Sequence, residues 1–185
     1  LLVEATKRCM TYEIAAQELC DVVIDKKVAQ ELWSLGDCIA SLSAVAGRRH
    51  ALLLNQGACE IFRGSDVPEN LDQIVHVMTQ EAVRLGVPAG SDWRFGLPAN
   101  DTPINAPVEL VLGIEPYCRS FFDAIKLTDP YAQAVCCAKA AGRMLAVAAG
   151  GEEPEMEPAI AKPLAMSAMT ESYKSVCMQN AYASL

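Results

Sequence analysis

Hydrophobic residues recur every three or four positions along most of this chain, which is the spacing of amphipathic helices. The pattern predicts helices over residues 3–26, 28–46, 49–63, 66–86, 108–127, 130–148 and 163–184. We find no run with the apolar and polar alternation of a β-strand. The expected fold is therefore all-α, with about seven helices stacked as antiparallel αα-hairpins in one domain, residues 1–185.

Glycines, prolines and charged residues mark the expected ends of these helices. The Gly47-Arg48 break is interpreted as a tight turn that joins helices 28–46 and 49–63 into one hairpin. Asp129-Pro130 has the sequence of a helix cap followed by a first helical residue. Pro163 marks the expected start of the C-terminal helix, 163–184.

Two segments interrupt the helical pattern. Residues 87–107 contain four prolines and two internal glycines, which predicts a long loop. Connections beyond about 12 to 15 residues are uncommon in compact domains and are often functional. Residues 150–162 contain four glutamates that repel one another, which predicts a solvated acidic linker.

Two stretches resemble tetratricopeptide-type repeats, which are helix-turn-helix units of about 34 residues. In residues 32–62, Trp33, Leu35 and Gly36 resemble the opening of such a repeat. In residues 121–145, Phe121 and Pro130 resemble the end of one repeat, and the next would start after them. The similarity covers about 70 residues and implies a helical stack that binds other proteins. The alternative architecture is an irregular helical bundle.

Composition and charge narrow the class of protein. The net charge of −8 disfavours nucleic acid as a partner, because binding to phosphate backbones requires clustered Lys and Arg. No apolar stretch reaches about 18 residues, so we expect no transmembrane helix. The eight cysteines include no CxxC motif and lie mostly on apolar helix faces. They are expected to be buried free thiols in a reducing, cytoplasmic environment.

Two short segments are candidates for binding. Trp93, Arg94 and Phe95 lie in the middle of the long loop, and Trp and Arg are enriched at interface hot spots. This segment is a candidate partner-binding element, and the alternative is that its aromatic side chains anchor the loop onto the helices. Arg48, Arg49 and His50 are a candidate anion contact if they begin a helix, where free N–H groups attract negative charge.

Catalytic and metal-binding patterns are weak. A thiolate nucleophile requires a nearby base, and Cys59 with His50 or His76 is the one such arrangement in the sequence. His76 lies between two valines, which favours a half-buried structural histidine. No pair of Cys or His residues has the short spacing of a structural zinc site. We therefore expect no enzyme activity, no metal and no cofactor.

The function predicted from these patterns is a protein–protein interaction or scaffold domain in a larger intracellular assembly. Its partners would be other protein subunits, including further copies of the chain. One alternative is a self-assembling, capsid-like coat or shell subunit. Another is a helical bundle that binds a small apolar ligand or cofactor.

Overall fold

The computed structural model describes residues 2–28, 33–53, 71–90 and 107–183, and every regular element among them is helical. The elements are α1 (Leu2–Val23), a single π-helical turn η1 (Ile24–Val28), α2 (Leu35–Leu53), α3 (Asp72–Arg84), α4 (Pro107–Ala124), α5 (Pro130–Ala149) and α6 (Pro158–Ala183). The all-α prediction is confirmed. The described ranges hold six α-helices, whereas the sequence pattern predicted about seven for the whole chain.

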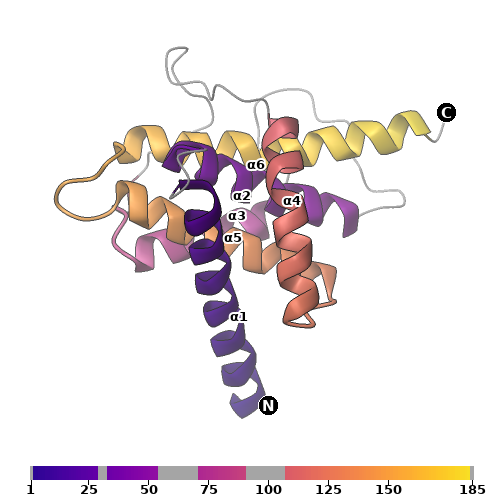
Figure 1. The fold of residues 1–185 in the computed structure, drawn as a ribbon, viewed down its shortest axis with the longest axis horizontal. Helices are drawn as coiled ribbons and strands as arrows, with labels where there is room; N and C mark the ends of the chain where they lie inside the picture. The colour runs from indigo at the N-terminus through magenta and orange to yellow at the C-terminus, as the bar shows by residue number, and fades with distance from the viewer. Residues whose placement is uncertain (1, 29–32, 54–70, 91–106, 184–185) are drawn as a thin grey trace.

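Helix α2 lies at the centre of the fold. Its residues from Gly36 to Gly47 are almost all buried, and it packs most extensively against α6 and α5, with α4 also in contact. Figure 1 shows α6 along the long axis of the molecule, with α1 and α4 crossing it steeply. Helix α5 in turn packs against α1 and α3, so it links the periphery to the centre.

The turn predicted at Gly47-Arg48 is wrong, because α2 continues without a break from Leu35 to Leu53. Gly47 instead lies where α2 meets α6, and a Cβ atom there would come within 2.1 Å of the Met169 carbonyl oxygen. Glycine is therefore required for close helix packing rather than for a turn. Part of the predicted helix 49–63 belongs to α2, and its residues beyond position 53 lie outside the described ranges.

Side-chain caps fix the starts of α2 and α5. Before α2, the Ser34 amide and hydroxyl donate to the Asp37 carboxylate, and the Asp37 amide donates to the Ser34 hydroxyl oxygen. These bonds satisfy N–H groups that have no partner within the helix. The Asp129 carboxylate likewise accepts from the amides of Tyr131 and Ala132, which confirms the predicted cap of α5.

The last helix begins earlier than predicted. It starts at Pro158, and Pro163 lies inside it rather than at its first turn. Residues 150–157 form a non-helical segment whose four glutamates are exposed. A solenoid of hairpins would pack each helix mainly against its sequence neighbours, whereas α2 packs mainly against the distant α5 and α6. The six described α-helices therefore pack together largely through contacts between segments that are distant in the sequence.

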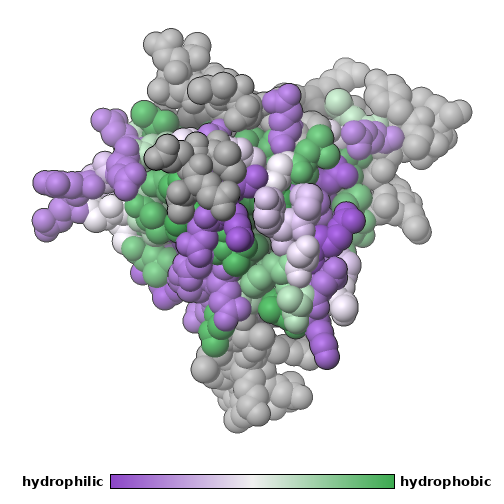
Figure 2. Space-filling view, in the orientation of Figure 1, coloured by the Kyte–Doolittle hydropathy of each residue, from purple (hydrophilic) through white to green (hydrophobic). Residues whose placement is uncertain are grey.

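Helix packing leaves some large apolar side chains on the surface. On the face seen in Figure 2, hydrophobic residues are interspersed with hydrophilic ones. Among all described residues, the most exposed large apolar side chains are Ile14, Leu112, Val147 and Met178. No helix in the described ranges is long and apolar enough to span a membrane.

Candidate functional site

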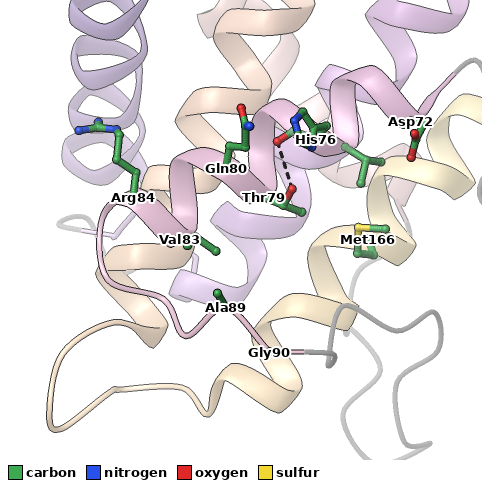
Figure 3. Close-up of a pocket in the computed structure, with 10 residues that line it drawn as sticks. Asp72, His76, Thr79, Gln80, Val83, Arg84, Ala89, Gly90 and Met166 are labelled. Carbon is green, nitrogen blue, oxygen red and sulfur yellow. Dashed lines mark hydrogen bonds between the residues drawn. The ribbon is translucent and has the colours of Figure 1, made fainter.

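An open groove runs along the outer face of α3. It has a volume of about 830 Å³ and lies between α3, Met166 of α6 and the segment that ends at Ala89 and Gly90 (Figure 3). The α3 side chains that line it are Asp72, Val75, His76, Thr79, Gln80, Val83 and Arg84. The groove is thus built from α3, from the segment that directly follows it, and from α6, which is distant in the sequence.

The sequence of α3 explains why one of its faces is left for the groove. Ile74, Met78 and Ala82 recur every four residues, are fully buried, and attach the helix to the core. On the opposite face, His76 and Gln80 are exposed to solvent. The helix ends at Arg84, and Gly86 follows with a φ of 108°, a conformation that favours glycine.

Two contacts hold the far wall of the groove in place. The Val87 amide donates to the Ala82 carbonyl oxygen at 3.0 Å, which ties the chain to the end of α3. The Lys162 ammonium donates to the Pro88 carbonyl oxygen at 2.6 Å, and this lysine of α6 is only 1% exposed. A buried charged donor makes a strong hydrogen bond, so the wall is fixed to both α3 and α6.

The lining of the groove combines apolar side chains with hydrogen-bonding ones. Val75, Val83 and Met166 supply apolar contacts, while His76 and Gln80 supply hydrogen-bonding groups. The Thr79 hydroxyl donates to the His76 carbonyl oxygen at 3.1 Å, so it bonds to the backbone of its own helix. Among the described residues, no group of three His, Cys, Asp or Glu side chains is arranged to hold a metal ion.

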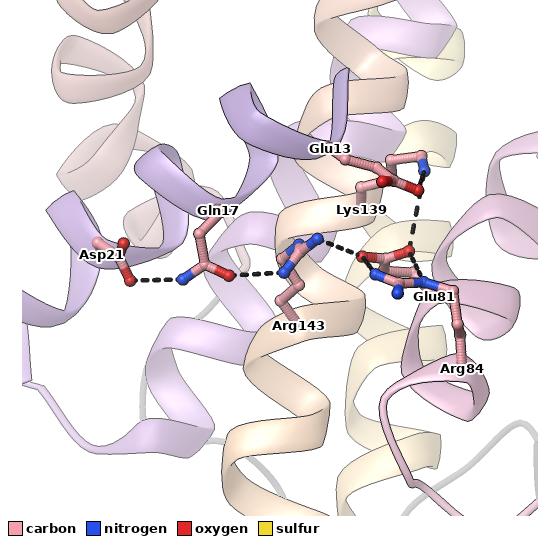
Figure 4. A network of polar contacts seen from close by, with 7 residues as sticks. All are labelled: Glu13, Gln17, Asp21, Glu81, Arg84, Lys139 and Arg143. Carbon is pink, nitrogen blue, oxygen red and sulfur yellow. Dashed lines mark hydrogen bonds and ion pairs between the residues drawn. The ribbon is translucent and has the colours of Figure 1, made fainter. Parts of the chain in front are cut away.

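A polar cluster lies behind α3, at its junction with α1 and α5 (Figure 4). Glu81 is 3% exposed and accepts from Arg84 Nε and Nη2 at 3.0 and 2.8 Å. Arg143 Nη2 lies 2.9 Å from the same carboxylate, and Lys139 Nζ lies 3.8 Å from it. Lys139 also contacts Glu13 of α1 at 3.8 Å. One buried carboxylate therefore fixes α3 to α5 and, through Lys139, to α1.

The charges around Glu81 determine its ionisation. Burial alone raises the pKa of the Glu81 carboxyl, but the hydrogen bonds from Arg84 and the charges of Arg143 and Lys139 outweigh it. The net effect is a pKa below the ordinary 4.5. The carboxylate is therefore ionised at neutral pH and holds the three cations together.

Acid is expected to remove the contribution of the Glu81 carboxylate to the stability of the fold. Because the folded pKa of Glu81 is lowered, its stabilisation is present above the unfolded pKa and is lost as the pH falls through the folded value. Urea unfolding midpoints of the wild type and Glu81→Gln should differ at about pH 6 and converge towards about pH 3. A gap of constant size across that range would show that Glu81 ionisation does not contribute.

The predicted anion contact is placed differently by the structure. Arg48, Arg49 and His50 lie in the last turns of α2 rather than at a helix start, so the basis of that prediction is wrong. Arg49 donates to Glu115 at 2.6 Å and to Gln133, and its guanidinium lies 4.9 Å from the Phe122 ring centre. The arginine thus joins α2 to α4 and α5.

His50 is buried at the same end of α2. Its ring is stacked on Tyr173 of α6 at a centroid distance of 6.2 Å, and Tyr131 of α5 lies at 6.3 Å. These contacts place His50 in the packing between helices. The prediction that His76 is a half-buried structural residue is wrong. Its side chain is exposed in the α3 groove.

The other sequence-derived candidates lie outside the described ranges. These are the partner-binding segment Trp93, Arg94 and Phe95, and the thiol Cys59. The α3 groove was not predicted from the sequence. The one residue that could have indicated the groove is Val83, an apolar residue on the otherwise polar side of α3, where it is 36% exposed.

The cysteines whose side chains are described are buried, and none of them forms a disulfide. They are Cys20, Cys38, Cys118, Cys136, Cys137 and Cys177. Burial is the main reason that the pKa values of Cys20, Cys38 and Cys136 rise to about 12. A thiol with such a pKa is not a nucleophile at neutral pH.

Comparison of the chain with protein-family models, with curated proteins and with solved structures finds no match. Its function is therefore inferred from the chemistry of its own surfaces.

Proposed function

We propose that this chain is a non-catalytic protein–protein interaction domain that acts as a scaffold in a larger intracellular assembly. Its α3 groove receives an amphipathic helix from a protein partner. No metal or cofactor is part of the proposal.

The groove itself carries the proposal. It combines apolar side chains with hydrogen-bonding groups along one face of a helix, and its volume of about 830 Å³ can accept several side chains. An amphipathic helix binds such a groove through apolar residues spaced three and four apart. Asp72 and Arg84 lie at opposite ends of α3, so they would favour one orientation of a charged partner helix.

The polar cluster behind α3 supports a preformed binding surface. Glu81 ties α3 to Arg143 and Lys139 of α5, while Lys162 holds the opposite wall at Pro88. A surface that is already ordered loses less conformational entropy when a partner binds. The groove is therefore suited to recognition with little rearrangement of its own backbone.

The cysteines support an intracellular location. Six buried cysteines in the described part of the chain form no disulfide, which is typical of proteins that fold in a reducing environment. We therefore propose the cytoplasm as the place of action.

Self-assembly is a second candidate function, and the charges of α3 favour it. If two copies paired their α3 helices antiparallel about a two-fold axis, Asp72 of each copy would face Arg84 of the other. Such self-complementarity is a requirement of a symmetric contact. Light scattering over a concentration series separates the two functions, since self-assembly gives a discrete oligomer and a scaffold domain stays monomeric.

A charge in the groove tests the leading proposal. Val83→Asp should weaken capture of the protein partner at least about tenfold, because the new carboxylate would be buried by the docked helix. Quantitative mass spectrometry of proteins retained on the immobilised chain, taken from extracts of its source cells, measures the loss.

Val147→Asp is the matched control, because this valine of α5 is 51% exposed and does not line the groove. The control should retain the same proteins as the wild type. Circular dichroism should show equal helicity for the wild type, Val83→Asp and Val147→Asp. Equal retention by the Val83 and Val147 variants would contradict docking in the groove.

A further inference from the structure

One ammonium group lies between two aromatic rings at the edge of the bundle. Lys27 Nζ, in the π-helical turn η1, is 4.4 Å from the Trp33 ring centre and 4.9 Å from the Tyr117 ring centre. Both distances are within the range of about 6 Å in which a cation is attracted to an aromatic face. The two rings belong to different segments, since Trp33 precedes α2 and Tyr117 lies in α4.

The Trp33 ring is positioned by backbone atoms on two sides. The Trp33 amide donates to the Lys27 carbonyl oxygen at 3.1 Å. Gly113 of α4 lies directly beneath the indole, because a Cβ there would come within 2.5 Å of Trp33 Cζ2. Gly113 and Tyr117 are four residues apart on α4, so the same face of this helix seats the first ring and supplies the second.

The pair is accessible from solvent. Tyr117 is 38% exposed, and Trp33 and Lys27 are partly exposed.

Lysine is a weak occupant of such a site. Within the described ranges, no carboxylate forms an ion pair with Lys27. A primary ammonium is compact and strongly hydrated, so it gives up favourable contacts with water when it enters an aromatic pair. A methylated ammonium is less hydrated, and its recognition by aromatic side chains is well established.

We propose that Trp33 and Tyr117 form a binding site for a methylated ammonium group, and that Lys27 fills this site when no ligand is present. The ligand chemistry is a quaternary nitrogen, supplied either by a trimethylated lysine side chain or by a choline group. The inference is independent of the α3 groove, because it involves different helices and a different ligand.

Binding can be followed at Trp33. The chain contains two tryptophans, so a Trp93→Phe background leaves Trp33 as the only indole signal in fluorescence and NMR spectra. The probes are acetylated trimethyl-lysine amide, its unmethylated counterpart, choline, and 3,3-dimethylbutanol, which has the shape of choline without the charge. Both methylated cations should perturb the Trp33 signal, and the neutral and unmethylated probes should bind at least about fivefold more weakly.

Three substitutions complete the test. Lys27→Met removes the competing ammonium and should tighten binding of the methylated cations about fivefold. Lys26→Met, the neighbour in the same turn, has no aromatic contact in the described part of the chain and should leave the affinity unchanged. Tyr117→Leu should abolish binding, and circular dichroism checks that it folds.

Equal binding of choline and 3,3-dimethylbutanol would overturn the proposal, as would an affinity that Lys27→Met leaves unchanged. These two comparisons, choline against 3,3-dimethylbutanol and wild type against Lys27→Met, test the proposal even if Tyr117→Leu fails to fold. Tighter binding of the trimethyl-lysine probe would identify a protein as the source of the ligand, and tighter binding of choline would identify a lipid or a small metabolite.

Discussion

Replacing Gly47 with alanine is expected to destabilise the protein by about 3 kcal/mol. Intrinsic helix propensity predicts the opposite sign, because alanine is the better helix former by about 1 kcal/mol. The new Cβ, however, would lie 2.1 Å from the Met169 carbonyl oxygen and 2.9 Å from its carbon. Both are backbone atoms of α6, so relief of the clash requires the two most extensively packed helices to separate.

Gly36→Ala in the same helix is the matched control. Its Cβ would come within 3.1 Å of Met156 Cε, the end of a flexible side chain that can move. We expect this variant to change the free energy of unfolding by less than about 1 kcal/mol. Urea unfolding followed by circular dichroism measures both variants. If Gly47→Ala were as stable as Gly36→Ala, the close approach of α2 and α6 would be wrong.

Glu81→Ala is the second substitution with a large expected effect. It leaves Arg143 and Lys139 side by side in a largely buried position without the carboxylate that both approach. Removing one partner of a buried charge cluster typically costs about 3 to 5 kcal/mol, because the remaining charges are desolvated and unpaired. We expect a loss of about 3 kcal/mol in the free energy of unfolding.

Glu18→Ala provides the comparison for this substitution. Glu18 is exposed on α1, so its removal should change stability by no more than about 0.5 kcal/mol. Thermal unfolding at low and high salt adds a second readout, since a buried cluster is screened less than a surface ion pair. A small, strongly salt-dependent effect of Glu81→Ala would place the cluster at the surface.

Much of the helical framework could be predicted because local signals agreed with the final packing. The helix predicted over residues 66–86 includes α3, and Ile74, Met78 and Ala82, spaced four apart, form its buried face. The Asp129 cap with Pro130 fixed the start of α5, observed at Pro130–Ala149 against the predicted 130–148. In these helices, capping and hydrophobic periodicity are both local properties of the sequence.

The errors arose where a residue serves a contact with a distant part of the chain. Gly47 was interpreted as a turn because glycine ends many helices, whereas its role depends on the backbone of α6. Pro163 was interpreted as a helix start, but α6 already begins with Pro158. Either proline fits a first turn locally, so the sequence pattern alone does not choose between them.

The α3 groove could not be predicted from the sequence for the same reason, since it depends on contacts between distant parts of the chain. His76 and Gln80 are neighbours on one helix face, but the opposite wall comes from Gly90 and from Met166 of α6. Nothing in the spacing of residues along α3 indicates which segments will lie across from it. A concave surface of this kind becomes visible only when the packing of α3 and α6 is known.

Site-specific photo-crosslinking tests the central claim most directly. A photoreactive amino acid is placed at Gln80, inside the α3 groove, and separately at Glu18, on the exposed side of α1. In living cells, position 80 is predicted to give a discrete covalent adduct with a protein partner, and Val83→Asp should remove that adduct. Adducts that form equally from both positions, or that persist with Val83→Asp, would contradict the assignment of the α3 groove as the partner-binding site.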